Sequence, residues 1–369
     1  MEKESKILVA GYTGLVGSAI TKILKSRGYK NLLLKDVSDL DMTKQADVKA
    51  FFGKEKPEYV ILAAAKVGGV VANNIYRGEF IYINLMIQNN VIHHAWENGV
   101  KKLLFLGSTC IYPREAPQPL KEEYLLSGPL EYTNEPYAIA KIAGMKLCES
   151  YNIQYGTNFI AVMPTNLYGP NDNFDLEKSH VLPALLRKIH LGKCMENGDW
   201  DRIRKDLNTY PVEGVSGSNT NDEILRILNK YGVKLTGNQF SVEIWGTGKP
   251  MREFMYSEDM AAACVFMMEH VDIARINGFT PDSMSRFGPR KIHFVNIGTG
   301  VEISIRDLAF KIKEILGYKG EIHFNTEKPD GTMRKLTNVD ILHGLGFKHT
   351  VDLDHGIELM YNAYLSKQD

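Results

Sequence analysis

The stretch Lys6-Ile-Leu-Val-Ala-Gly-Tyr-Thr-Gly-Leu-Val-Gly17 indicates how this chain folds. It begins with an apolar run typical of a buried strand, and residues 18–26 read as a helix. A glycine-rich turn between strand and helix lets backbone N–H groups and the helix dipole meet a phosphate, although such glycines can also form a simple tight turn. The order of strand, glycine loop and helix favours a dinucleotide site. Its candidate residues are Gly11, Gly14, Leu15, Val16 and Gly17.

Two adjacent residues after the next strand point to different dinucleotides. Residues 31–35 read as this strand, and Asp36 follows about 20 residues past the glycine loop, where an acid often binds the adenosine ribose hydroxyls of NAD. Lys35 could instead meet the 2′-phosphate of NADP. The residues themselves leave both cofactors open. Asp41, in the next loop, is a further candidate ligand.

Strands and helices alternate through residue 163. Apolar runs at 59–65, 103–106 and 159–163 read as buried strands with helices between them. This pattern predicts an α/β fold with a doubly wound, mostly parallel Rossmann sheet. Loops at the ends of these strands supply further candidate cofactor residues, namely Ala63, Ala64, Ala65, Pro164, Asn166 and Leu167.

The pattern breaks near residue 190, where a second domain is expected. We assign residues 1–168 and 252–300 to the dinucleotide-binding domain, and residues 169–251 and 301–369 to a smaller α/β C-terminal substrate domain. Residues 195–240 are polar and contain a turn-rich stretch, with helices expected at 200–207 and 222–231. We read them as an inserted subdomain that could be a lid or an oligomer contact.

Composition restricts the class of protein. The chain has 369 residues, of which 44% are hydrophobic and 24% charged, as in ordinary globular proteins. Lys plus Arg and Asp plus Glu both number 44, which argues against nucleic acid or an anionic membrane as the main partner. The four cysteines have neither zinc-site nor disulfide spacing, so we expect no metal and a cytoplasmic location. We find no signal peptide and no apolar run long enough to span a bilayer.

A tyrosine and a lysine four residues apart form the first candidate catalytic pair. Tyr137 and Lys141 share one face of an expected helix, with Asn134 as a possible cap and Pro136 in its first turn. A lysine ammonium beside a phenol should lower the tyrosine pKa, so Tyr137 could give a proton to a carbonyl oxygen during hydride transfer. Such a spacing also arises by chance on surface helices.

The strand at 103–106 ends in Gly107-Ser108-Thr109-Cys110, where the chemistry of open α/β sheets collects. Ser108 could hydrogen-bond a substrate carbonyl beside Tyr137. Cys110 follows in an apolar run, where a lone cysteine is more often a small core residue than a reactive one. The residues alone leave both readings of Cys110 open.

Further candidates lie in the second half of the chain. His180 begins an expected helix and could be a surface cap residue or an acid or base near neutral pH, and Lys188 lies on the same helix. Trp245 and Arg252 occupy one loop, which suits a base or sugar face and a phosphate, although both could be structural. The turn with Lys328 and Asp330 could reach a diphosphate or simply be solvated.

Several long strings make the chain resemble the GDP-L-fucose synthase family of extended short-chain dehydrogenase/reductases over nearly its whole length. That family is also called GDP-4-keto-6-deoxymannose 3,5-epimerase/4-reductase. The strings, in this order, begin with Ala63-Ala-Ala-Lys-Val-Gly-Gly, Leu104-Phe-Leu-Gly-Ser-Thr-Cys-Ile-Tyr-Pro and Thr133-Asn-Glu-Pro-Tyr-Ala-Ile-Ala-Lys-Ile-Ala-Gly. They continue with Met163-Pro-Thr-Asn-Leu-Tyr-Gly-Pro-Asn-Asp-Asn-Phe, Ser179-His-Val-Leu-Pro-Ala-Leu, Trp245-Gly-Thr-Gly, Met251-Arg-Glu-Phe and Lys328-Pro-Asp-Gly-Thr.

The resemblance implies roles for individual residues. The reductase triad falls on Ser108, Tyr137 and Lys141, and the epimerisation acid/base pair on Cys110 and His180. Contacts to GDP fall on Trp245 and Arg252, and on Lys328 or its neighbours. Lys188 and Asp330 join the candidate substrate set, and Lys141 and His180 also join the cofactor set. The family further implies NADPH as cofactor and a homodimer, often built from two helices per subunit.

Three departures from the family pattern bear on these expectations. Tyr12-Thr13 replaces the His-Arg of many members, which weakens the inference of NADP over NAD. Thr109 replaces a common serine after Ser108. The segment 195–240 is longer than the connection usual in the family. The nearest alternative is a GDP-L-colitose synthase acting on GDP-4-keto-3,6-dideoxymannose, in which only C5 would need inversion. A non-catalytic nucleotide-binding scaffold or redox sensor is the alternative from another class.

Overall fold

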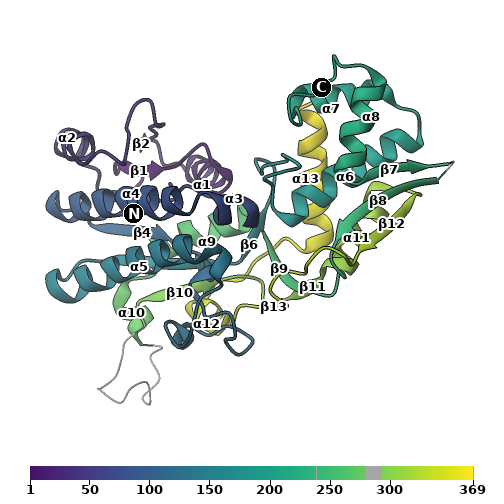
Figure 1. Ribbon diagram of the computed structural model, residues 1–369. Coiled ribbons are helices and arrows are strands. Elements are labelled where there is room, and N and C mark those ends of the chain that lie inside the picture. The colour runs from purple at the N-terminus through teal and green to yellow at the C-terminus, as the bar shows by residue number, and fades with distance from the viewer. Residues whose placement is uncertain (238, 279–291, 369) are drawn as a thin grey trace. The chain divides into compact units, whose positions relative to one another are not determined.

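The computed structural model describes residues 1–237, 239–278 and 292–368 (Figure 1). They divide into unit 1 (Met1–Leu167, Glu253–Gly300 and Leu336–Thr350) and unit 2 (Tyr168–Arg252, Val301–Lys335 and Val351–Asp369). The sequence assigned all of 301–369 to the second domain, and this is wrong for Leu336–Thr350. Those residues belong to unit 1 because the Leu120 N–H donates to the Leu336 carbonyl at 2.7 Å, and the Thr350 N–H donates to the Asp259 carboxylate at 3.0 Å.

Unit 1 is built on a six-stranded sheet in the order β10-β5-β4-β3-β1-β2, and each neighbouring pair is parallel. The predicted doubly wound Rossmann sheet is therefore confirmed. The strand predicted at 31–35 is much shorter than expected. The strands are β1 (Ile7–Ala10), β2 (Leu32–Leu33), β3 (Tyr59–Leu62), β4 (Lys102–Leu106), β5 (Phe159–Pro164) and β10 (Phe294–Ile297).

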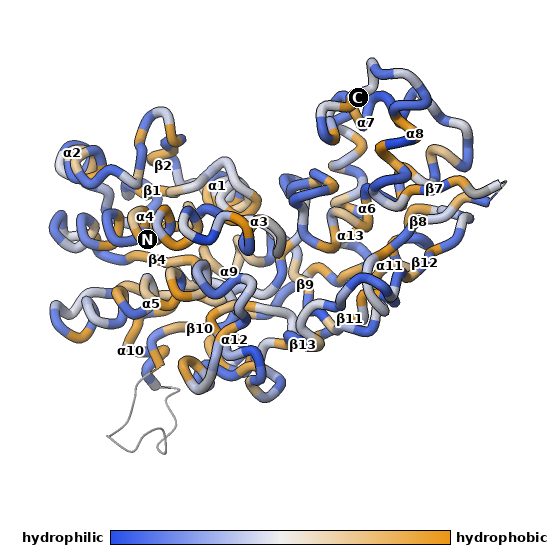
Figure 2. The backbone as a smooth tube through the Cα atoms, in the orientation of Figure 1, coloured by the Kyte–Doolittle hydropathy of each residue, from blue (hydrophilic) through white to orange (hydrophobic). Residues whose placement is uncertain are grey.

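Helices cover both faces of this sheet. Successive strand residues point to opposite sides, so the apolar side chains of each strand pack against helices on both faces. Ile7 and Val9 of β1 pack with α1, α9 and α12, whereas Leu8 and Ala10 pack with α2, α4 and α5. In Figure 2 the helices carry hydrophilic and hydrophobic segments in turn, as expected for helices with one buried side. The helices of unit 1 are α1 (Leu15–Ser26), α2 (Gln45–Glu55), α3 (Val70–Ile75), α4 (Arg77–Glu97), α5 (Glu135–Tyr155), α9 (Ser257–His270), α10 (Ile273–Asn277) and α12 (Asp340–Leu345).

A buried carboxyl group lies against β10. The Glu122 side chain is 4% exposed, and its Oε1 accepts a hydrogen bond from the Asn296 N–H at 2.9 Å. Burial raises the pKa of this carboxyl from 4.5 to about 7, since the charged form loses its water. The folded protein therefore binds a proton at pH 5 to 7 that the unfolded chain has released, and folding is opposed as the pH rises through this range.

The Glu122→Gln variant is expected to lose this pH dependence, because an amide keeps the acceptor oxygen but does not ionise. Between pH 5 and 8 the wild-type free energy of unfolding should fall by about 2–3 kcal/mol more than that of the variant. Urea unfolding at both pH values measures the difference. Glu123→Gln, on the exposed neighbouring residue, is the matched control. Equal pH slopes for wild type and Glu122→Gln would contradict the assignment.

Unit 2 contains a three-stranded sheet in the order β12-β8-β7, with β12 parallel and β7 antiparallel to β8. A short strand, β13, pairs in parallel with β9, which lies next to β11. The strands within unit 2 are β7 (Val233–Thr236), β8 (Gln239–Trp245), β11 (Glu302–Ser304), β12 (Glu321–Asn325) and β13 (Arg334–Lys335). Two further strands, β6 (Asn166–Tyr168) and β9 (Met251–Tyr256), each contain residues of both units. The helices are α6 (Val181–Glu196), α7 (Trp200–Thr209), α8 (Asn221–Lys230), α11 (Ile305–Leu316) and α13 (Leu353–Ser366).

The segment 195–240 is an integral part of unit 2 rather than a separate subdomain. Both predicted helices form, as α7 and α8, and Thr220 begins α8 with a capping box to Glu223. Their apolar side chains share one buried cluster with Leu191 and Cys194 of α6. The suggested roles as a lid or an oligomer contact stay predictions. Over the residues described, no helix combines the length and apolarity that crossing a bilayer requires.

Candidate functional site

Close backbone packing surrounds Gly11 and Gly17 of the glycine loop, whereas there is open space beside Gly14. Gly11 has φ +82°, and a Cβ there would lie 2.7 Å from the Ala64 nitrogen, while a Cβ on Gly17 would overlap the Gly11 carbonyl. A Cβ on Gly14 would meet only the Gly11 oxygen, at 3.6 Å. Gly14 also precedes α1, whose first turn carries no acidic side chain. A phosphate can therefore approach the N–H groups of Leu15, Val16 and Gly17, and the loop fits a dinucleotide.

The two acidic candidates after β2 are engaged in their own turns. Asp36 Oδ1 accepts from the Ser38 N–H at 2.8 Å and the Ser38 hydroxyl at 2.6 Å. Asp41 Oδ1 accepts from the Thr43 N–H at 3.0 Å and the Thr43 hydroxyl at 2.6 Å. These bonds lower the pKa of both carboxyls. One oxygen of each carboxylate is thus committed to its own turn, and the roles of Lys35 and Asp41 in binding a dinucleotide stay predictions.

The loop after β3 is held by a residue that the sequence analysis missed. Asn84 is 2% exposed, and its Oδ1 accepts from the Lys66 N–H at 2.9 Å while its Nδ2 donates to the Lys66 carbonyl at 3.0 Å. This clamp fixes the loop that follows Ala63, Ala64 and Ala65. Asn84 lies in the interior of α4, which begins at Arg77. A buried asparagine within a helix needs hydrogen-bond partners. An asparagine at this helical position was therefore the feature of the sequence that could have indicated the contact.

Tyr137 and Lys141 lie on α5 as predicted, with Pro136 in the first turn. Asn134 occupies the cap position, but its side chain makes no capping hydrogen bond, so that expectation is wrong. Lys141 Nζ donates to the Leu106 carbonyl at 2.7 Å and lies 5.7 Å from the centre of the Tyr137 ring. Lys141 is therefore anchored to the end of β4 and lies beside the Tyr137 ring.

The expected lowering of the Tyr137 pKa is not found. Burial raises the pKa of Tyr137 above its usual value, and the nearby Cys110 raises it further. Burial also lowers the pKa of Lys141 to about 8. Spacing predicted the attraction between the two groups but could not show the loss of water around both. The protonated phenol that results is the form needed by a proton donor.

Cys110 lies in a short 3-10 turn, Thr109–Ile111, which follows β4, and Ser108 is the cap residue of this turn. The Ser108 Oγ accepts from the Cys110 N–H at 3.3 Å, so its own O–H can donate to another oxygen. Cys110 is buried and forms no disulfide, and its proximity raises the pKa of both Tyr137 and Lys141, against or along with the larger effect of burial. The fold thus brings together Ser108, Cys110, Tyr137 and Lys141 at the carboxyl end of β4.

The remaining candidates of unit 1 lie near the end of β5. Pro164 ends this strand opposite Ile297, and the Asn166 Nδ2 donates to the Glu253 carbonyl at 2.9 Å. Leu167 packs against the core on the α1 side of the sheet. His180 lies in unit 2, where it precedes α6 with an exposed side chain and makes no capping bond. The pairing of His180 with Cys110 stays a prediction.

Unit 2 contains a cavity of about 290 Å³ that gathers four of the predicted substrate residues. Lys188 from α6, Trp245 from β8, Arg252 from β9 and Asp330 line it, with apolar walls from Val181, Ala184, Leu185, Ile244, Pro250, Ile305 and Pro329. Burial lowers the pKa of Lys188 to about 8, and burial also lowers the pKa of Arg252. Both groups are cationic at neutral pH, so the cavity suits an anion attached to an apolar or aromatic group.

The rim of this cavity is held by Asp330. Its two oxygens accept from the Thr247 N–H at 2.8 Å and the Thr247 hydroxyl at 2.7 Å. Arg252 Nη1 donates to the Thr332 carbonyl at 2.6 Å, which ties β9 to the same turn. Lys328 Nζ lies 5.3 Å from the centre of the Trp245 ring, and Trp245 remains 60% exposed. Trp245 therefore presents a planar face beside several cations.

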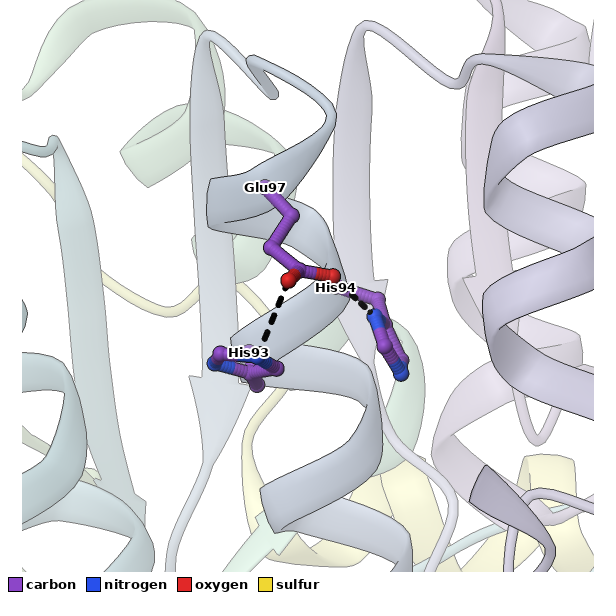
Figure 3. Close-up of side chains that lie close together, drawn as sticks. All are labelled: His93, His94 and Glu97. Carbon is purple, nitrogen blue, oxygen red and sulfur yellow. Dashed lines mark hydrogen bonds and ion pairs between the residues drawn. The ribbon is translucent and has the colours of Figure 1, made fainter. Parts of the chain in front are cut away.

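One group in the described part of the chain has the spacing of metal ligands, namely His93, His94 and Glu97 on α4. Figure 3 shows the Glu97 carboxylate between the two imidazole rings. It binds His94 Nδ1 at 2.6 Å and pairs with His93 Nε2 at 3.3 Å, while His93 Nδ1 bonds the Tyr151 hydroxyl at 2.8 Å. These bonds account for the cluster without an ion. The expectation that the chain needs no metal stays a prediction.

Comparison with known proteins identifies the family. The model of the NAD dependent epimerase/dehydratase family matches residues 7–205 and 207–278. The chain belongs to this family. Within it, GDP-L-fucose synthase 1 of Arabidopsis thaliana is 47% identical, covering 99% of this chain and 94% of that one. GDP-L-fucose synthase of Escherichia coli K12 is 44% identical, covering 99% and 98%.

A protein of known structure is also similar to this chain. It is a GDP-mannoheptose C4 reductase from Campylobacter jejuni with NADP bound, 45% identical with a TM-score of 0.85, covering 99% of both chains. The resemblance to the GDP-L-fucose synthase family drawn from the sequence is therefore confirmed over nearly the whole chain.

Proposed function

We propose that this chain converts GDP-4-keto-6-deoxy-D-mannose to GDP-L-fucose by 3,5-epimerisation and 4-reduction with NADPH. The observation that carries the proposal is the buried thiol of Cys110 beside Tyr137 and Lys141. A plain ketoreductase has no use for that thiol, and a non-catalytic scaffold has no use for any of the three. Identity of 44–47% to GDP-L-fucose synthases supports the same reaction.

In this proposal, reduction depends on Ser108, Tyr137 and Lys141. The Ser108 hydroxyl donates to the C4 oxygen and holds the ketone in place. Bound NADPH supplies the hydride to C4. Tyr137 supplies the proton to the oxygen, which its raised pKa allows because the phenol stays protonated until the oxygen becomes basic. The ammonium of Lys141 stabilises the phenolate that Tyr137 then becomes.

Epimerisation at C3 and C5 requires an acid and a base on opposite faces of the sugar ring. The C4 ketone acidifies both C–H bonds, because removal of either proton gives an enolate. Ser108 and Tyr137 can donate hydrogen bonds to the enolate oxygen. Cys110 and His180 are the proposed pair that removes and returns the carbon-bound proton, since thiol and imidazole pKa values can both be moved toward neutrality.

The cavity of unit 2 is the proposed site for the GDP group. Lys188 and Arg252 offer positive charge to the diphosphate, and Lys328 adds a further cation near the Trp245 ring. The exposed face of Trp245 offers a stacking surface for the guanine base. Asp330 shapes the rim through Thr247 and keeps the loop around Gly248 in place.

The Trp245→Ala variant tests this placement. Loss of an aromatic stacking face should weaken GDP binding by about 1–3 kcal/mol, or roughly 5- to 150-fold in Kd. Isothermal titration calorimetry with GDP measures the change. Trp245→Phe keeps a ring and should recover much of the affinity. An unchanged Kd in Trp245→Ala would place the base elsewhere.

NADP is the proposed dinucleotide. The loop at Gly11, Gly14 and Gly17 fits a pyrophosphate, and Lys35 is the side chain available for a 2′-phosphate, which NAD lacks. The Campylobacter relative carries bound NADP. Tyr12-Thr13 stands where many members have an arginine, so the activity with NADPH must be compared with that with NADH. A ratio of kcat/KM for NADPH over NADH below 1 would overturn the choice.

A reductase of GDP-4-keto-heptoses is the second candidate, because the C4 reductase from Campylobacter jejuni is as similar as the fucose synthases. The two functions share the reduction step and differ in the sugar. Steady-state kcat/KM values for the deoxyhexose and heptose substrates decide between them. A higher value for the heptose would favour the second candidate. The colitose alternative predicts turnover of the 3,6-dideoxy sugar instead.

We further propose a cytoplasmic homodimer. Large apolar side chains are exposed on α4 and α5, among them Tyr82, Ile139, Ile153 and Tyr155. The two helices lie side by side in unit 1 (Figure 1). Light scattering that gives the mass of one chain at micromolar concentration would exclude the dimer.

The four buried, reduced cysteines suit the cytoplasm, and fractionation of the source cells tests that location.

A further inference from the structure

The thiol of Cys110 sits on a turn that needs outside support. Thr109–Ile111 is a single 3-10 turn, and such short turns have poor hydrogen-bond geometry of their own. On its N-terminal side, Ser108 holds the Cys110 N–H at 3.3 Å, and the Gly107 N–H donates to Val162 of β5 at 2.8 Å. The C-terminal side is held by Tyr112.

Tyr112 follows the turn and is anchored to the neighbouring part of the sheet. Its hydroxyl donates to the Asn296 Oδ1 of β10 at 2.5 Å. Tyr112 is 4% exposed and Asn296 is fully buried, so water does not compete for this bond. Burial keeps the pKa of Tyr112 well above its usual range, and the hydroxyl stays a donor.

Asn296 is itself fixed, so its oxygen is a rigid acceptor. Its Nδ2 donates to the Leu120 carbonyl at 2.9 Å and the Asn338 carbonyl at 3.3 Å, which sets the orientation of the amide. Its N–H donates to Glu122 at 2.9 Å. Residues 120–122 and Asn338 therefore hold Asn296 in place, and its side-chain oxygen receives the Tyr112 hydroxyl.

We propose that Tyr112 is a positioning residue for epimerisation, because its hydrogen bond to Asn296 holds the turn that carries Cys110. This inference rests on the proposed function. Proton transfer to and from carbon depends steeply on the placement of the acid or base. Tyr137 and Lys141 lie on α5, and Ser108 follows Gly107, whose N–H is bonded to β5, so the residues proposed for reduction are held on the other side of the turn from this anchor.

The Tyr112→Phe variant tests the inference by separating the two steps. Epimerisation is measured alone with GDP-4-keto-6-deoxymannose and NADP⁺ in deuterated water, as deuterium uptake at C3 and C5. Hydride transfer is measured alone as oxidation of GDP-L-fucose by NADP⁺, followed by absorbance at 340 nm. The variant is expected to lose deuterium uptake at least tenfold, with hydride transfer within threefold of wild type and KM within twofold.

Tyr29→Phe is the matched control, since it removes a tyrosine hydroxyl bonded to Glu269 at 2.6 Å elsewhere in the same unit. It should leave both rates unchanged. If Tyr112→Phe melts well below Tyr29→Phe, both rates are compared at a temperature at which circular dichroism shows that the variant is fully folded.

Two outcomes overturn the inference. They are normal uptake in a folded Tyr112→Phe, and an equal loss of uptake and hydride transfer in that variant. A wild-type enzyme that neither exchanges deuterium nor oxidises GDP-L-fucose would overturn the proposed function itself, and this result is visible before any variant is made.

Discussion

Replacing Tyr137 with phenylalanine is expected to lower kcat for ketone reduction by about 10²–10⁴-fold, the usual contribution of a positioned general acid. The phenylalanine keeps the ring contact with Phe80, whose centroid lies 6.3 Å away, so the fold should survive. Only the hydroxyl that protonates the C4 oxygen is lost. The loss should appear in kcat and leave KM nearly unchanged, because the cavity proposed to bind GDP lies in unit 2.

NADPH consumption at saturating keto-sugar measures this effect. Tyr132→Phe is a suitable control, since Tyr132 is 67% exposed and close to Tyr137 in the sequence. It should react at the wild-type rate. A Tyr137→Phe enzyme with kcat within threefold of wild type would show that another group protonates the oxygen.

The Asp206→Ala variant is expected to destabilise the protein by about 3–5 kcal/mol, the cost of leaving a buried charge without its partner. Arg187 and Asp206 are both fully buried and pair at 2.7 Å, and the Tyr364 hydroxyl also bonds Asp206. Arg187 further donates to the Phe174 carbonyl at 2.9 Å. This network joins α6, α7 and α13, so its loss should affect the whole of unit 2.

Urea unfolding followed by tryptophan fluorescence measures the change, with Trp200 and Trp245 reporting on unit 2. Asp201→Ala, on the exposed side of the same helix, should cost far less. The double variant Arg187→Met with Asp206→Leu should be more stable than Asp206→Ala, because it leaves no unpaired charge. A loss below about 1 kcal/mol in Asp206→Ala would contradict the account, since removing one partner of a buried pair is strongly destabilising.

Much of unit 1 could be predicted because its signals are local. The glycine loop, the apolar runs of β1, β3, β4 and β5, and the helical spacing of Tyr137 and Lys141 each lie within a short stretch. The position of Leu336–Thr350 could not be predicted, because it depends on distant partners. The Thr337 N–H, for example, donates to the buried Glu253 at 2.9 Å.

In the candidate site, too, local features could be predicted from the sequence and features that depend on the folded structure could not. Sequence patterns indicated Ser108, Cys110, Tyr137 and Lys141, and the fold places them together. The direction of the Tyr137 pKa was wrong, because residue spacing carries no measure of burial. Asp36 was a reasonable ribose ligand by its position, but its turn with Ser38 is visible only in three dimensions.

The central claim is that one site epimerises and reduces a GDP-4-keto-sugar. It is tested most directly by one incubation of the enzyme with GDP-4-keto-6-deoxymannose and NADPH in deuterated water, followed by the mass and configuration of the product sugar. The account predicts GDP-L-fucose with deuterium at both C3 and C5. Reduction without deuterium would contradict it, because the enzyme would then be a simple ketoreductase and Cys110 and His180 would have no catalytic role.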